Sequence, residues 1–132
     1  MAIQLPDNAH DLLSRPIVAA LITVMPDGQP QATPVWFDFD GENIRVNTAE
    51  GRQKARNMSR DSKVTVFLLD PQNPYHWLEW RGHVVDVREA SQGAIEHMGL
   101  LSMRYTGSPE YKLDPEEKRL MYVIAADKIN AR

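Results

Sequence analysis

Short apolar runs rich in β-branched residues recur along this chain, and turn-forming residues separate them. Runs of this length and composition favour strands over helices. Segment 76–87 also alternates, so that Trp77 and Leu78 are expected on opposite faces of a strand. The pattern predicts six strands, at residues 17–25, 31–39, 44–48, 63–70, 76–87 and 120–126.

Helical patterns are short and lie between these runs, at residues 6–13, 51–61 and 91–104. We expect Asp7 or Asn8 to cap the first helix and Pro16 to end it. In the third, the apolar contacts are expected from Ile95, Met98, Leu101 and Met103. Six strands with tight turns and short helices predict a mainly β fold, a small antiparallel barrel formed by one domain of 132 residues.

Three residues modify the strand pattern. Pro30 and Pro34 lack the N–H that a sheet ladder needs, so part of segment 31–39 should be an edge, a bulge or a ligand-facing stretch. Gly82, within the long alternating strand, indicates a bulge or a close approach of another backbone.

The helix predicted at residues 51–61 carries four cationic side chains in a chain whose net charge is −3. At 100° per residue, Ala55 and Met58 share a face that should contact the core. Arg56 and Arg60 should point away from it, towards water.

Arg52 and Lys54 differ from these because they lie beside the start of the helix. Free backbone N–H groups and the helix dipole favour an anion there, so the two cations are candidates for a phosphate site. A solvated basic helix explains the same charges without any ligand.

Composition excludes several classes of function. A slightly acidic chain is a poor match for DNA or RNA as the main partner. The chain has no cysteine, and its four histidines have no metal-binding spacing, so no metal site is expected. The absence of a long apolar run and of a signal-like N-terminus predicts a cytoplasmic protein without a membrane partner.

Aromatic residues concentrate on two predicted strands and include all three tryptophans, which are Trp36, Trp77 and Trp80. A barrel core with a subunit interface would account for them. A planar heterocycle would use the same surfaces, and a phosphate site next to an aromatic wall is what a flavin-like cofactor requires.

Three segments in this order resemble the pyridoxamine 5′-phosphate oxidase-like split-barrel family of flavin and deazaflavin proteins: ALITVMPDGQPQATPVWFDFDGENIRVNTA, GRQKARNMSRDSKVTVFLLD and NPYHWLEWRGHVV. They cover roughly residues 18–88, about half of the chain. The resemblance implies a six-stranded split β-barrel and a homodimer with two cofactor sites at its interface.

The resemblance also implies cofactor-binding residues. Residues 32–36 match the strand whose backbone runs beside the isoalloxazine ring, and Trp77 matches a position that reaches the cofactor. Lys54 matches the phosphate-binding lysine, and Arg52 is its expected helper. The full set of candidates is Ala32, Thr33, Pro34, Val35, Trp36, Asn47, Thr48, Arg52, Lys54, Asn57 and Trp77.

The chain departs from authentic pyridoxamine phosphate oxidases in two places. Gln53-Lys54 stands where they have Arg-Lys, and the residues up to Arg132 contain no match to their C-terminal tryptophan and arginine segment. Vitamin B6 oxidation is therefore not expected. The patterns KxRNxxRD and NPYxxLExRG are more similar to the subgroup that binds the deazaflavin coenzyme F420.

The function implied is hydride transfer between coenzyme F420 and an unsaturated or oxidised small molecule, with no covalent catalytic residue identified. An FMN-dependent reductase or oxidase of the same fold is the first alternative. A flavin- or heme-binding module without enzymatic activity is the second.

Overall fold

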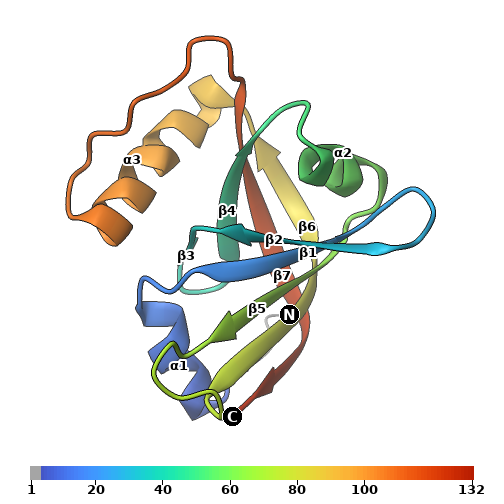
Figure 1. Ribbon diagram of the computed structural model, residues 1–132, viewed down its shortest axis with the longest axis vertical. Helices are drawn as coiled ribbons and strands as arrows, with labels where there is room; N and C mark the ends of the chain where they lie inside the picture. Colours follow the sequence, from blue (N-terminus) through green and yellow to red (C-terminus); the bar gives the residue numbers. More distant parts are fainter. Residues whose placement is uncertain (1–3) are drawn as a thin grey trace.

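Seven antiparallel strands form one strongly curled sheet in the computed structural model, which describes residues 4–132 (Figure 1). The strands are β1 (Ala19–Val24), β2 (Pro30–Val35), β3 (Phe37–Phe39), β4 (Ile44–Ala49), β5 (Lys63–Leu69), β6 (Trp77–Arg88) and β7 (Arg119–Ala131). The helices are α1 (Asp7–Ser14), α2 (Gln53–Arg60), the 3₁₀ turn η1 (Ala90–Gln92) and α3 (Ala94–Thr106). A mainly β fold with short helices is confirmed, and the curled sheet is that of a split barrel.

The strand count is seven instead of six because segment 31–39 forms two strands. The strand order is β2-β1-β5-β6-β7-β4-β3, so consecutive strands β2 and β3 lie at opposite edges of the sheet. β2 pairs with β1, and β3 pairs with β4. Trp36 is the residue at which the chain passes from one edge to the other, and this crossing brings the two edges together.

Tyr105 of α3 holds this crossing in place. Its hydroxyl accepts a hydrogen bond from the Phe37 N–H at 3.1 Å and donates to the Ile17 carbonyl at 2.6 Å. The Tyr105 ring stacks on Trp36 with 4.9 Å between ring centroids and 6° between planes. Burial raises the pKa of Tyr105, so the hydroxyl keeps its proton.

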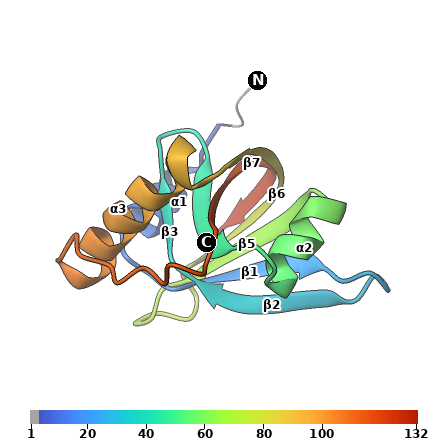
Figure 2. The same cartoon turned by 90° about the horizontal axis from the view of Figure 1, so that it is seen from above.

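The interior of the curled sheet is apolar, and helices lie around it (Figure 2). The inner side chains include Leu21, Phe37, Val66 and Trp80, and α1 contacts β3 and β6 at one end. α2 contacts β1 and β4, while α3 lies outside the barrel against β4 and β7. No helix built by residues 4–132 combines the length and apolar character that a membrane crossing needs.

Two expectations for the helices were wrong. α1 begins after Pro6, and neither Asp7 nor Asn8 caps it with a side-chain hydrogen bond. In α3, Ile95 and Met103 are 38% and 50% exposed, because only one stripe of an outer helix can contact the sheet. The other two predicted contacts of α3, Met98 and Leu101, are buried.

Gly82 lies where β6 and β7 come into close contact. The register between these strands shifts between Arg81 and Gly82, as expected for a bulge. A Cβ at Gly82 would lie 1.9 Å from the carbonyl oxygen of Ala125, so only glycine fits. β7 extends to Ala131, beyond the predicted end at residue 126, because β6 pairs with it to the end.

We expect Gly82→Ala to lower the free energy of unfolding by about 3 kcal/mol, since the backbone of β7 would have to move. Gly99→Ala is the matched control. The new Cβ would lie 3.5 Å from its nearest neighbour, the Pro109 carbonyl oxygen, which is an ordinary contact distance. In a helix, replacing glycine by alanine can raise the free energy of unfolding by up to about 1 kcal/mol. Urea denaturation of both variants measures the difference, and equal stabilities would contradict the close approach.

Candidate functional site

Cationic side chains meet where β4 leads into α2. Gly51, with a φ of +92°, makes the turn between them, and Arg52 precedes the first helical residue without a capping side-chain hydrogen bond. The first N–H groups of the helix therefore have no intrahelical acceptor. Ala55 and Met58 are buried against the barrel, as the helical spacing predicted.

Lys54 is half-buried beside this turn and has no hydrogen-bond or ion-pair partner among residues 4–132. Burial lowers its pKa, and the nearby charges of Arg52 and Arg119 lower it further. Three cations thus lie close together. An ammonium that has lost part of its hydration and lies beside two guanidinium groups is an arrangement that an anion would stabilise.

Within residues 4–132, Glu117 supplies the one carboxylate that is hydrogen-bonded to this cluster. It accepts hydrogen bonds from Arg52 at 2.8 Å and from Arg119 at 3.1 Å. These contacts hold the pKa of Glu117 below its ordinary value. No local motif in the sequence marks Arg119 or Glu117 as a site residue.

Asn47 contributes to the cluster indirectly, through Arg119. Its side-chain oxygen accepts a hydrogen bond from Arg119 Nε at 2.9 Å. Its amide nitrogen donates to the Ala94 carbonyl at 2.9 Å and lies 3.1 Å from His97 Nδ1. All polar atoms of the Asn47 side chain are therefore used within the protein, and they orient Arg119.

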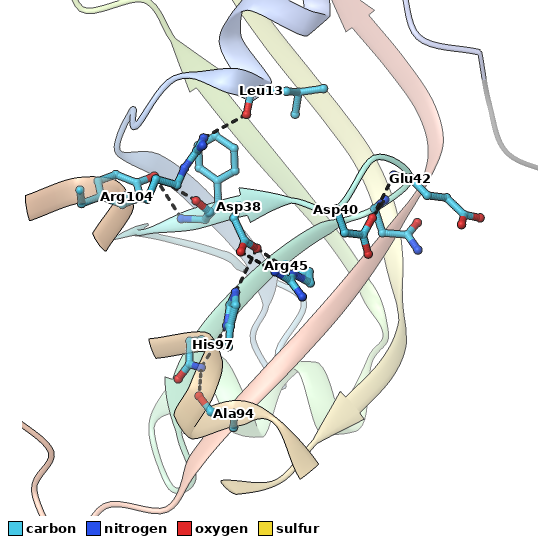
Figure 3. Close-up of polar contacts among 12 residues, drawn as sticks. Leu13, Asp38, Asp40, Glu42, Arg45, Ala94, His97 and Arg104 are labelled. Atoms are coloured by element: carbon cyan, nitrogen blue, oxygen red, sulfur yellow. Dashed lines mark hydrogen bonds and ion pairs between the residues drawn. The ribbon is translucent and has the colours of Figure 1, made fainter. Parts of the chain in front are cut away.

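The same network continues through His97 to β3 (Figure 3). His97 Nε2 lies 3.0 Å from Asp38, which also receives two hydrogen bonds from Arg45. Burial would raise the pKa of Asp38, but the contacts with His97 and Arg45 outweigh it and lower that pKa. His97 accepts from Asn47 and donates to Asp38, so both ring nitrogens have a structural role.

Asn57 lies on the other flank of α2 and is fully buried. Its amide nitrogen donates to Thr23 Oγ1 at 3.0 Å and Gln31 Oε1 at 3.3 Å, and its oxygen accepts from Gln53 at 2.8 Å. These bonds join α2 to the β1–β2 hairpin. Asn57 thus fixes the orientation of the helix that carries Lys54.

The outer arginines of α2 are exposed, as predicted, but they are not free in water. Arg60 donates to the Val24 carbonyl and to Asn57. Arg56 donates to the Gly51 carbonyl at 2.8 Å and to Gln53 at 2.6 Å. Neither has a carboxylate partner within residues 4–132. They contribute to the lining of an open cavity of about 600 Å³ between α2 and β7.

β2 contains residues 32–35 and is an edge strand of the sheet. The Met25 N–H donates to the Gln29 carbonyl at 2.8 Å, so by alternation Gln31 and Thr33 bond to β1 while Ala32 faces the free edge. Pro30 and Pro34 face the same edge. Because prolines have no N–H, Ala32 is the one residue of β2 with an N–H directed to this edge.

The outer surface of β1 and β2 forms a shallow hollow beside this edge. It has a volume of about 340 Å³ and is lined by Val18, Ala19, Ala20, Ala32, Thr33 and Pro34. Val35 is buried, and Trp36 packs on Tyr105. Small and apolar side chains thus leave a flat surface next to a donor N–H and carbonyl acceptors.

Two of the predicted site residues hold buried hydroxyls without a partner. Among residues 4–132, the unsatisfied buried side-chain atoms are Thr33 Oγ1, Thr48 Oγ1, Trp80 Nε1 and Arg104 Nε. Unsatisfied buried polar atoms are uncommon in native proteins. Of the four residues with these atoms, Thr33 and Thr48 are the predicted site residues, and a ligand would satisfy their hydroxyls.

Trp77 lies at the other end of the sheet from α2. It pairs with Leu69, the last residue of β5, while Lys63 at the first end of β5 follows closely on α2. Six strand residues separate these ends by about 20 Å. Trp77 contacts Phe67 there, with ring centroids 6.0 Å apart. Within one chain, the fold does not bring Trp77 to the Lys54 cluster.

Asp11, Asp70 and His76 also come together, near the start of β6. Arg15 pairs with both carboxylates, at 3.2 Å and 3.0 Å, and so compensates part of their negative charge. His76 bonds to the Arg132 carbonyl and to Asp11, and these bonds raise its pKa. The group therefore ties α1 to the last strand.

Comparison with known proteins identifies the family of this chain. Residues 5–131 match the model of the family described as pyridoxamine 5′-phosphate oxidase. The chain belongs to this family. The match covers nearly the whole chain, including α2 and the β2 edge, and the family comprises flavin- and deazaflavin-related oxidoreductases.

Solved structures with the same fold include an F420 reductase that is 35% identical, with a TM-score of 0.83 over 96% of this chain and 98% of that one. A conserved hypothetical protein from Mycobacterium tuberculosis is 24% identical, with a TM-score of 0.77 over 98% of this chain and 85% of that one. A Listeria innocua protein provisionally named a pyridoxamine 5′-phosphate oxidase is 19% identical, with a TM-score of 0.74 over 95% of each chain. The last two similarities concern the fold alone.

We expect Asn57→Leu to lower the free energy of unfolding by about 1–3 kcal/mol, because it leaves buried Thr23 without its donor. The double variant Asn57→Leu/Thr23→Val removes both partners and should recover part of this loss. Urea denaturation of the two variants, with Thr23→Val alone as the reference, measures the coupling. Additive losses would contradict the direct bond.

Proposed function

We propose that this chain is a cytoplasmic oxidoreductase that binds the deazaflavin coenzyme F420 and transfers a hydride between it and an unsaturated or oxidised small molecule. The observation that carries this proposal is the half-buried Lys54, which lies near Arg52 and Arg119 and has no partner among residues 4–132. A phosphate at the start of α2 would satisfy all three cations and the free helix N–H groups. Thr48, at the end of β4, would offer its unsatisfied hydroxyl to the adjoining chain of the cofactor.

The ring of the cofactor would lie against β2. The hollow beside Ala32 and Pro34 is flat and apolar, as a planar heterocycle requires. The Ala32 N–H would donate a hydrogen bond to the polar edge of that ring, and the carbonyls of the two prolines lie on either side of it. The prolines also prevent another strand from pairing along the whole of this edge.

A homodimer would complete the site. Trp77 is too far from the Lys54 cluster to serve the same cofactor within one chain, so a second copy would have to supply it. This arrangement agrees with the two interface sites that the family resemblance implies.

The bound deazaflavin would supply the hydride chemistry. The residues of this chain would orient it: Lys54, Arg52 and Arg119 at the phosphate, and the β2 backbone at the ring. The two ring nitrogens of His97 already bond to Asn47 and Asp38. We therefore assign no proton transfer to this histidine.

F420 is favoured over FMN by the cations beyond the phosphate site. Arg56 and Arg60 have no carboxylate partner within residues 4–132 and contribute to the lining of the 600 Å³ cavity next to the β4–α2 turn. The tail of F420 continues beyond its phosphate into carboxylates, which these arginines would bind. FMN has no such tail.

Titration of the purified protein with F420 and with FMN tests the proposal directly. We expect saturable binding of F420 and weaker binding of FMN. Micromolar binding of FMN without any binding of F420 would favour an FMN-dependent enzyme. A mass spectrum of the ligand that copurifies from a host making both cofactors provides an independent check.

Lys54→Ala should weaken F420 binding by about 1.5–3 kcal/mol, the scale of a hydrogen bond to a charged group. Lys128 is an exposed lysine on β7. Lys128→Ala removes the same charge and, as the matched control, should have little effect on F420 binding. Arg60 is a less suitable control because it bonds to the Val24 carbonyl. Isothermal titration calorimetry compares the variants, and equal losses would place the phosphate elsewhere.

Ala32→Pro should weaken binding of the ring about tenfold, because it removes the N–H directed to the free edge while leaving the bonds to β1 intact. Ala32→Ser keeps the N–H and serves as the control. Binding of inorganic phosphate should be the same in both variants. If both variants bind F420 equally well, the β2 edge does not read the ring.

A further inference from the structure

Glu117 makes the cationic cluster at α2 less positive than its three cations alone would make it. Arg52, Lys54 and Arg119 carry one positive charge each, and Glu117 carries one negative charge. The last residues before β7 thus bring an internal carboxylate to the place where a phosphate would bind.

The two arginines that Glu117 contacts are held very differently. Arg119 is 5% exposed and also donates to Asn47 at 2.9 Å and to Met98 Sδ at 3.2 Å. Arg52 is 47% exposed, and Glu117 is its one side-chain partner within residues 4–132. A ligand can therefore attract Arg52 away from Glu117, whereas Arg119 must stay in place.

The third cation, Lys54, has no such counter-ion within residues 4–132. An anion that binds to Lys54 and Arg52 together must replace the Glu117 contact to Arg52 and must tolerate the nearby carboxylate. The repulsion between Glu117 and the ligand weakens binding more as the negative charge of the ligand grows, because like charges in a partly buried site repel.

We propose that Glu117 is a specificity-determining residue, a built-in counter-anion that competes with the ligand for Arg52 and disfavours highly charged anions over a single phosphate group. This inference rests on the proposed function only in taking the Lys54 cluster as the place where a phosphate binds. The geometry that carries it is the bridge of Glu117 between one exposed and one buried arginine.

The experiment titrates the purified full chain, dialysed free of small molecules, with inorganic phosphate and with pyrophosphate by calorimetry. Glu117→Gln keeps the size of the side chain and removes its charge. We expect it to tighten phosphate binding about fivefold, the scale of one charge pair near a surface, and to tighten pyrophosphate binding more. Glu116→Gln removes an equal charge one residue away, from an exposed side chain, and should change neither affinity.

Weaker binding in Glu117→Gln would overturn the proposal, since Glu117 would then position Arg52 instead of competing for it. Equal tightening in Glu116→Gln would also overturn it, because only the net charge would matter. A thermal melt of each variant checks that the fold is kept, and Glu117→Asp, which retains the charge, should bind pyrophosphate as weakly as the parent chain.

Lys54→Ala separates this inference from the proposed function. If phosphate binding depends on Lys54 but Glu117→Gln leaves it unchanged, only the role of Glu117 fails. If phosphate binding in the parent chain does not depend on Lys54, the phosphate site itself is refuted, and the competition with Glu117 is refuted with it.

Discussion

The hydroxyl of Tyr105 holds the point at which the chain passes from one edge of the sheet to the other. It bonds to the backbone of Phe37 and Ile17, and its ring stacks on Trp36. This corner joins β2 and β3, which are the two edges of the sheet. With it, the sheet closes into a split barrel, and β2 keeps one free edge beside a flat apolar surface.

Closure of the barrel also explains the position of α2. The helix packs its apolar face on the barrel, and Asn57 fixes its rotation through buried hydrogen bonds to the β1–β2 hairpin. The first turn of α2 therefore points Lys54 towards the start of β7. Arg119 arrives there oriented by Asn47, so two separate hydrogen-bond networks converge on one cluster of cations.

The cluster is a balance of opposing charges as well as a set of cations. Burial lowers the pKa of Lys54, and the repulsion among the three positive groups lowers it further. Glu117 relieves the repulsion in the absence of a ligand. A phosphate would do the same more completely, because it can contact Lys54 as well.

The sequence by itself determined the strands, the helix at the end of β4, the close approach at Gly82 and the edge character that Pro30 and Pro34 impose. These features follow from local rules: side-chain alternation, the missing proline N–H and the missing glycine Cβ. Only the tertiary structure decided that the strand breaks at Trp36, that Asn47 and Asn57 bond within the protein, and that Trp77 lies far from Lys54. It also brought Arg119 and Glu117 to Arg52, although Glu117 and Arg52 are 65 positions apart along the chain. Such contacts depend on strand register and barrel closure, which the whole core sets together and no local pattern encodes.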